Sequence, residues 1–271
     1  MKKAFFITII ALPILFFIAF GFEVLIIESE LVYEAMRYSD SLNNNETVFV
    51  IAPVTLYDDF LTDPYNGDIW DFTAYHSGTV TSDVAVFTNG AVMLKNGVDD
   101  NDETEFAGEL RWYGNKWCAM EAKIANKDVT YGAFFVGFSD IQTTGNDEIA
   151  VMYSGTTVDI DAVTEAAGFV YDPSGTDPDY IMGVAIKSDV AGTVVTHSVD
   201  PPAIDEAFVL RVTIDGDGDC DFWIDGVHIG RTETGITTTT ALCPYIGYIN
   251  HGEGANNYFL VDYVWVWQRR N

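Results

Sequence analysis

The chain has 271 residues and a formal net charge of −28, with 41 Asp and Glu against 13 Lys and Arg. A field of that sign repels DNA and RNA, so the charge argues against a nucleic-acid partner. Beyond an apolar N-terminal segment about 220 residues remain, which is enough for one large β-sandwich with its own core.

The N-terminal segment is apolar and distinct from the rest. Lys2 and Lys3 precede Ala4–Phe22, an uncharged run of 19 residues. A helix of that length approaches the roughly 30 Å hydrocarbon core of a bilayer. The lysines predict that the N-terminus stays in the cytoplasm while the rest is exported. We therefore expect a hydrophobic helix that places the remaining chain outside the cytoplasm, on an extracellular or virion surface.

Two interpretations of this helix stay open, and a helix buried inside an assembly is a third. Small residues at Ala19 and Gly21 suit the cleavage site of a signal peptide. Apolar residues resume at Val24–Ile27. That continuation suits an uncleaved anchor, which would contact the membrane through residues 4–27 and continue as a short stalk.

From residue 54 onward the sequence predicts strands separated by short turns. Alternating or β-branched apolar residues mark the strands, and Gly, Asn and Asp mark the turns. In the first half the predicted strands are Val54–Phe60, a hairpin over Val84–Lys95 that turns at Asn89-Gly90, Leu110–Tyr113, Lys116–Ile124 and Tyr131–Phe138. Between them, Asp99–Glu105 is expected to be an acidic loop.

In the second half the predicted strands are Glu148–Tyr153, Ala167–Tyr171, Ile181–Ile186, Thr193–Thr196 and Tyr258–Gln268. The clearest pattern lies in Phe208–Gly230. Apolar side chains at the even positions from 208 to 214 alternate with Val209, Arg211 and Thr213, so one face of this strand is expected to be buried. Asp225-Gly226 predicts a type I′ hairpin turn, because that turn needs positive φ at both central residues.

These elements predict an all-β fold, a two-sheet antiparallel jelly-roll sandwich preceded by the N-terminal hydrophobic helix. We assign residues 1–40 to the signal or anchor helix with its stalk, 41–53 to an Asn-rich linker and 54–271 to the sandwich domain.

Three cysteines, Cys118, Cys220 and Cys243, show no C-x-x-C spacing. An odd number argues against a disulfide framework, and the spacing argues against structural zinc. Buried free thiols are the favoured interpretation, and a Cys220–Cys243 disulfide is the alternative.

The order of several short motifs resembles the concanavalin A-like (laminin-G-like) jelly rolls. They are Leu-x-Val-x-Ile-Asp from Leu210, Phe-Trp-Ile-Asp-Gly from Phe222, Pro-Tyr-Ile-Gly from Pro244 and Val-Asp-Tyr-Val from Val261, with Leu56–Phe60 and Ile69-Trp70 upstream. The resemblance covers residues 54 to 269. This family includes glycan-binding lectins, glucanases and non-enzymatic modules on cells and virus particles, so it implies the fold more than the function.

Catalysis is not expected. The resemblance implies that a glucanase of this fold would carry a Glu-x-Asp-x-x-Glu strand, whose alternation points the carboxylates into one cleft. This sequence contains no Glu-x-Asp. The nearest segment is Asn146–Ala150, where adjacent Asp147 and Glu148 would face opposite sides of a strand.

Calcium is the candidate cofactor. Asp215, Asp217, Asp219 and Asp221 stand at every second position, and flexible carboxylate loops suit this hard cation. An EF-hand starting at Asp215 fails, because Cys220 and Gly226 occupy its sixth and twelfth places. The alternative is a β-turn in which Asp and Gly are favoured for turn geometry alone. The acidic segments Asp99–Glu105 and Asp172–Asp179 are weaker candidates of the same kind.

Sugar binding would use exposed aromatic side chains beside polar ones. One candidate group is Trp112, Tyr113 and Trp117 around the Gly114-Asn115 turn; the other is Tyr171, Asp172 and Tyr180 around the 172–179 loop. The alternative for each aromatic residue is ordinary core packing.

The resulting prediction is a non-enzymatic, surface-displayed structural or attachment module on a virion or cell, with glycans or other surface proteins as partners. One alternative is a decoration or stalk subunit that binds other proteins, including copies of itself. Another is a glycosidase or lyase acting on polysaccharide.

Overall fold

The computed structural model describes residues 53–60, 69–75, 78–82, 90–97, 99–126, 130–144, 149–154, 157–160, 163–173, 180–196, 206–252 and 257–270, together with 10–11 and 14–15. The chain divides into two units, Met1–Ala52 and Pro53–Asn271. In the first unit only the antiparallel pair β1 (Ile10–Ala11) and β2 (Ile14–Leu15) is described. These four positions are strand where we expect helix. The rest of the predicted helix and stalk, and the linker up to residue 52, lie outside the described residues.

Among the residues described, no helix is long and apolar enough to cross a membrane.

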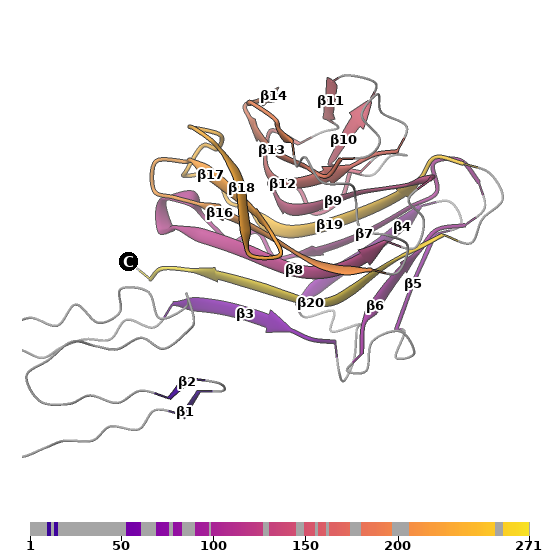
Figure 1. The fold of residues 1–271 in the computed structure, drawn as a ribbon, viewed down its shortest axis with the longest axis horizontal. Helices are drawn as coiled ribbons and strands as arrows, with labels where there is room; N and C mark the ends of the chain where they lie inside the picture. The colour runs from indigo at the N-terminus through magenta and orange to yellow at the C-terminus, as the bar shows by residue number, and fades with distance from the viewer. Residues whose placement is uncertain are drawn as a thin grey trace, which may run out of the picture. The chain divides into compact units, whose positions relative to one another are not determined.

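The second unit is an antiparallel sandwich of two sheets (Figure 1). The β20 sheet contains, in order, β18 (Val227–Thr232), β17 (Cys220–Ile224), β16 (Ala207–Ile214), β8 (Cys118–Asn126), β20 (Tyr258–Gln268), β6 (Val92–Lys95) and β5 (Thr79–Ser82), with β3 (Val54–Asp58) also paired to β20. The β19 sheet contains β14 (Val190–Ala191), β13 (Met182–Lys187), β12 (Glu165–Tyr171), β9 (Gly132–Ser139), β19 (Cys243–Asn250), β7 (Glu103–Gly108) and β4 (Trp70–Tyr75), with β15 (Val195–Thr196) paired to β13. A hairpin of β10 (Val151–Ser154) and β11 (Thr157–Ile160) is separate from both sheets.

The core between the sheets follows from strand alternation. In β16 the even positions from Phe208 to Ile214 are buried and the odd positions are partly exposed, as the sequence predicts. Aromatic side chains from both sheets meet in this core: Phe134 of β9 lies 5.0 Å, ring centre to ring centre, from Phe259 of β20. Such offset contacts stabilise a sandwich beyond the burial of area alone.

Several predicted elements are confirmed. The last strand spans Tyr258–Gln268 as expected. The hairpin after β17 turns at Asp225 and Gly226, whose φ values of 49° and 76° are both positive, as a type I′ turn requires.

Other predicted elements are wrong. Leu110–Tyr113 is not a strand: only Trp112 forms an isolated bridge, to Leu242, and the 3-10 helix η2 (Gly114–Lys116) follows. The strand after Gly90 pairs with β5, while the predicted partner, Val84–Thr88, lies outside the described residues. Most importantly, the expected acidic loop contains the start of β7, in which every residue is buried.

All three cysteines are free and buried, which confirms the favoured interpretation. Burial raises the pKa of the Cys243 thiol to about 12 and raises those of Cys118 and Cys220 as well. The thiols therefore remain protonated and unreactive in the folded protein.

Candidate functional site

The two sheets differ in what lies on their outer faces. On the outer face of the β19 sheet a second apolar cluster forms, in which Phe135, Val170 and Met182 pack with Ile149 and Val151 of the segment that leads into the β10–β11 hairpin. In Figure 1 this hairpin lies over β12 and β13, on the side away from β20. The face is therefore covered by the protein itself.

Gly247 shows how closely the cover approaches the sheet. A Cβ atom built on Gly247 would lie 2.8 Å from the Cβ of Ile149, which is too short for any real side chain. Only the absence of a side chain at this position lets Ile149 pack directly against the backbone of β19.

A pair of carboxylates, Glu103 and Glu105 of β7, lies on this covered face and is fully buried. The Tyr245 hydroxyl donates to Glu105 Oε1 at 2.5 Å, and the backbone N–H of Thr144 donates to the same oxygen at 3.0 Å. The Thr144 hydroxyl lies 3.0 Å from Glu105 Oε1 and 3.4 Å from Glu103 Oε1. Burial and the neighbouring Glu105 raise the pKa of Tyr245, so that hydroxyl keeps the proton that it donates.

Sequence reasoning missed this pair, because so many acids in a row suggest a solvated loop. The alternation of Glu103, Glu105 and Ala107 with Thr104 and Phe106 was the available signal. It places both glutamates on one face of a strand.

Within the described residues of Pro53–Asn271, the outer face of the β20 sheet carries side chains that are exposed or partly exposed. Strand pairing brings one residue from each of six strands into a single row across this face. In order, the row is Tyr57, Trp265, Glu121, Arg211, Trp223 and His228. All six are exposed or partly exposed, so we call this set the outer row.

Four aromatic rings cluster at the β3 and β20 end of the outer row. Trp265 and Trp267 lie 4.9 Å apart, ring centre to ring centre, and Tyr57 lies 6.0 Å from Tyr263 and 6.4 Å from Trp265. Tyr57 is 58% exposed and the other three are partly exposed. We call these four residues the aromatic platform.

The charged side chains beside the platform are paired with one another. Lys123 Nζ lies 2.6 Å from Asp262 Oδ2, and the Tyr263 hydroxyl donates to Glu121 Oε1 at 2.8 Å. Burial and the Glu121 carboxylate raise the pKa of Tyr263, so it stays a donor. Farther along the row the Arg211 guanidinium lies 4.8 Å from the Trp223 ring centre, within cation–π range.

The structure does not unite the two groups predicted to bind sugar. The η2 turn lies near the start of β12, because Asn115 bonds to Thr238 and Thr237 bonds to Glu165. Tyr171 ends the same strand, so the two groups lie at opposite ends of it.

Their individual positions also correct the prediction. Trp112, Tyr171 and Asp172 are buried, with 1–2% exposed, and cannot stack on a ligand. Tyr180 packs partly buried against the second apolar cluster. Tyr113 is partly exposed beside Lys116, and Trp117 alone is well exposed, at 47%, with the Arg269 guanidinium 4.3 Å from its ring centre.

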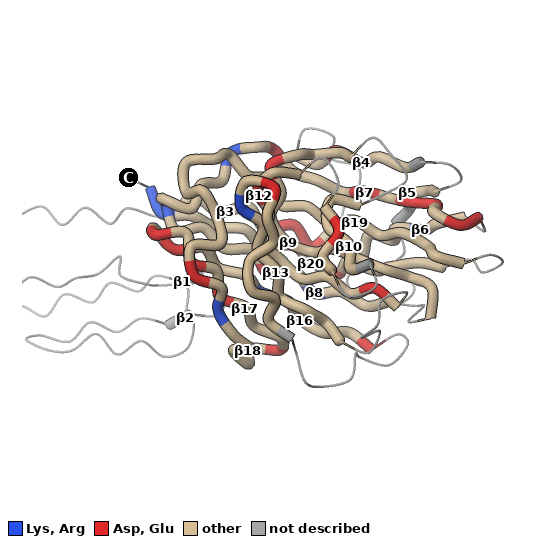
Figure 2. Tube along the Cα trace, turned by 90° about the horizontal axis from the view of Figure 1, so that it is seen from above, with Lys and Arg blue, Asp and Glu red and all other residues tan. Residues whose placement is uncertain are grey.

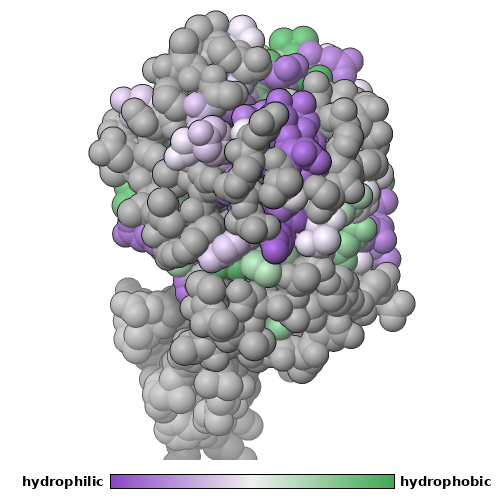
Figure 3. All heavy atoms as spheres, turned by 90° about the vertical axis from the view of Figure 1, so that its right-hand side faces the viewer, coloured by the Kyte–Doolittle hydropathy of each residue, from purple (hydrophilic) through white to green (hydrophobic). Residues whose placement is uncertain are grey.

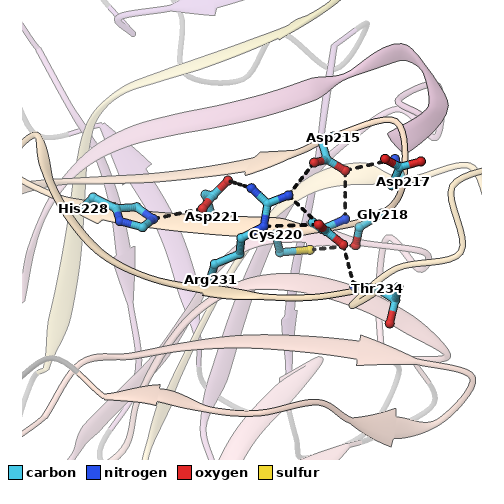
Figure 4. Close-up of polar contacts among 9 residues, drawn as sticks. Asp215, Asp217, Gly218, Cys220, Asp221, His228, Arg231 and Thr234 are labelled. Atoms are coloured by element: carbon cyan, nitrogen blue, oxygen red, sulfur yellow. Dashed lines mark hydrogen bonds and ion pairs between the residues drawn. The ribbon is translucent and has the colours of Figure 1, made fainter.

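Three of the four predicted calcium ligands, Asp215, Asp219 and Asp221, lie around an arginine (Figure 4). The Arg231 guanidinium contacts Asp215 at 2.7 Å and Asp221 at 2.9 Å, and it also contacts Asp219. Asp215 Oδ1 accepts the backbone N–H groups of Asp217 and Asp219. This arrangement matches the alternative interpretation, a β-turn shaped by Asp and Gly. The positive charge among the carboxylates is the guanidinium of Arg231.

Among the described residues, no group of three or more His, Cys, Asp or Glu side chains is placed to hold a metal ion. Of the weaker candidates, residues 174–179 of the Asp172–Asp179 loop lie outside the described residues. In the Asp99–Glu105 segment, the side chain of Asp102 is buried and accepts the backbone N–H of Asp99.

The charges are unevenly distributed over the domain. Figure 2 shows acidic positions throughout the described chain, whereas most basic positions lie toward the end that holds the C-terminus. At the opposite end, near β5 and β6, the described surface is mainly hydrophilic with only small hydrophobic areas (Figure 3). That end therefore offers no broad apolar contact surface among the described residues.

Comparison with known proteins identifies the fold. No family model matches the chain, and no curated protein matches it in sequence. The carbohydrate recognition domain of Emp47p superposes with a TM-score of 0.53 at 14% identity, over 79% of this chain and 94% of that one. A β-glucanase of Bacillus licheniformis gives 0.54 at 13% identity, over 80% and 98%. This chain has the concanavalin A-like jelly-roll fold.

The concanavalin A-like fold does not itself determine the activity. A protein of unknown function from Shewanella oneidensis MR-1 also superposes, with a TM-score of 0.53 at 9% identity over 84% of this chain and 92% of that one. Lectin-like and glucanase structures therefore match about equally well, and function has to be argued from the site.

Proposed function

We propose that this protein is a non-enzymatic glycan-binding module displayed outside the cytoplasm. One observation carries the proposal: the outer row and the aromatic platform leave ring faces and hydrogen-bonding groups accessible on the same sheet face. Ring faces pack against the apolar faces of sugars, while Glu121, Arg211 and His228 offer partners for hydroxyl groups. The charged N-terminal start and apolar run support export.

The test is direct binding by the full-length protein. A glycan array followed by titration calorimetry should show binding, while incubation with the bound glycan should release no reducing ends. Failure to bind any glycan on the array would refute the proposal and leave a role as a structural subunit that binds other proteins.

Polysaccharide cleavage is the second candidate, and the Glu103–Glu105 pair is the observation that favours it. Two carboxylates on one face of a strand, held by Tyr245 and Thr144, resemble the composition of an acid–base site. Their complete burial under the second apolar cluster argues against it, because a substrate could not reach them. Turnover of a β-glucan or alginate that is lost in Glu105→Gln but retained in Glu109→Gln would establish this candidate instead.

A further inference from the structure

We propose that the aromatic platform and the outer row bind an uncharged, extended polysaccharide chain laid across the strands of the β20 sheet. This inference rests on the proposed function and specifies its site and its class of ligand. It assigns binding to the outer face of the sheet that carries the C-terminal strand, rather than to either group of aromatic residues predicted from the turns.

The aromatic platform presents several rings on one face of the sheet. Trp265 and Trp267 are two residues apart on β20 and therefore project from the same face, and Tyr57 pairs with Trp265 from the adjacent β3. Large aromatic side chains at exposed or partly exposed positions keep apolar area in water, which a globular domain rarely does over a contiguous patch without a partner. Pyranose rings present apolar C–H faces of matching size, so stacking would bury this area on binding.

Charge determines the class of sugar. Lys123 and Asp262 form an ion pair, Glu121 accepts from Tyr263 and Arg211 lies against Trp223. These two bases and two acids cancel in formal charge. The chain as a whole carries −28, and such a field lowers the local concentration of polyanions. An uncharged polysaccharide meets no such barrier, whereas a uronic-acid or sulfated chain does.

Shape determines the extent of the ligand. From Tyr57 to Trp223 the row crosses five paired strands. At roughly 4.8 Å per strand spacing, the row spans about 19 Å, which accommodates several consecutive sugar units but far exceeds one. A sheet face with a row of this length suits an extended polysaccharide chain better than a single terminal sugar.

The experiment is a pull-down of the full-length protein with insoluble cellulose, curdlan and chitin as neutral probes, and with immobilised alginate as the anionic probe. We expect retention by at least one neutral probe, little retention by alginate, and an apparent Kd that changes less than about twofold between low and high salt. Retention by alginate alone, or retention abolished by salt, would overturn the assigned class.

Variants locate the site. Trp265→Ala combined with Trp267→Ala should weaken retention by at least tenfold, and Tyr57→Ala, at the most exposed position of the platform, should weaken it severalfold without affecting folding. Trp117→Ala tests the group predicted from the η2 turn, and Tyr131→Ala is the matched control, because Tyr131 is an exposed aromatic residue directly before β9 of the other sheet. Far-ultraviolet circular dichroism checks that each variant is folded.

The outcomes separate the two proposals. Loss of binding in Trp117→Ala but not in Tyr57→Ala or the double variant would keep glycan binding and overturn the site. No retention by any probe, neutral or anionic, would overturn both. A dimer in sedimentation that is lost in Tyr57→Ala would show that the platform is an interface between copies of this chain, which would also overturn the inference.

Discussion

The outer faces of the two sheets show how the same strand geometry can be used in opposite ways. On the β19 sheet, outward side chains such as Phe135 and Met182 meet Ile149 and Val151 and form a second core. On the β20 sheet, outward side chains are Trp, Tyr, Arg and Glu, and they remain partly exposed. The difference indicates that the covered face contributes more to stability than the face whose side chains contact water.

The largest expected effect tests the covered face. Phe135→Ala should lower the free energy of unfolding by about 3–5 kcal/mol, because Phe135 is fully buried and the truncation leaves a cavity. The matched change on the other face, Trp265→Ala, should cost less than half as much. Urea denaturation followed by circular dichroism measures both. Equal losses would mean that the outer faces do not differ as described.

A second test adds a side chain at Gly247, where Ile149 packs against the backbone of β19. Gly247→Val should cost about 1–3 kcal/mol, because the added side chain must displace Ile149 from the backbone of β19. Gly226→Asn is the control: its surroundings are open within 4 Å and Asn tolerates a positive φ, so little change is expected. Thermal unfolding compares the two. If Gly247→Val left the thermal stability unchanged, the segment that contains Ile149 would not pack tightly against β19.

The ion pairs of Arg231, on the edge strand β18 of the β20 sheet, should contribute less to the free energy of unfolding. Arg231→Met leaves Asp215, Asp219 and Asp221 facing one another without a cation, and should cost roughly 1 kcal/mol. Arg111→Met, whose ion-pair partner Glu109 is about half exposed, should change stability by less than about 0.5 kcal/mol. The same urea titration checks this pair, and restored stability of Arg231→Met on adding calcium would show that the carboxylates can hold a metal ion.

The smallest expected effect is on the pH dependence of the free energy of unfolding. The backbone N–H of Thr234 and the Arg231 side chain hold the pKa of Asp219 below its usual value. The folded pKa is therefore lower than the unfolded one, so this contribution is present above the unfolded value of about 3.9 and is lost as pH falls through the folded pKa. Urea midpoints between pH 7 and 3 should fall less steeply in Asp219→Asn. If the urea midpoint of Asp219→Asn fell with pH as steeply as that of the wild type, the pairing of Asp219 with Arg231 and Thr234 would be contradicted.

Much of the sandwich could be predicted from local pattern. Alternation in Phe208–Ile214, the Asp225-Gly226 turn and the β-branched and aromatic Tyr258–Gln268 segment are signals within a few residues, and all three are confirmed. The acidic start of β7 misled the prediction, because composition suggests water contact there. Glu105 is buried only because Tyr245 of β19 and Thr144 supply its hydrogen bonds.

The site was less predictable. Trp117 was singled out from its neighbouring turn, yet the aromatic platform combines Tyr57 with Trp265 from the two ends of the sandwich domain. A local signal did exist, since Tyr263, Trp265 and Trp267 share one parity on a single strand. No local signal shows that Glu121, Arg211 and Trp223 continue the same row.

The sequence by itself determined the class of fold and a charge unsuited to polyanions, because alternation, residue type and charge act locally or sum over the chain. Only the tertiary structure decided which strands are neighbours, which outer face is covered, and that Arg231 lies among the aspartates predicted to bind calcium. Those features depend on pairings between distant segments, and a side chain's burial or partner is defined only once both segments are in place.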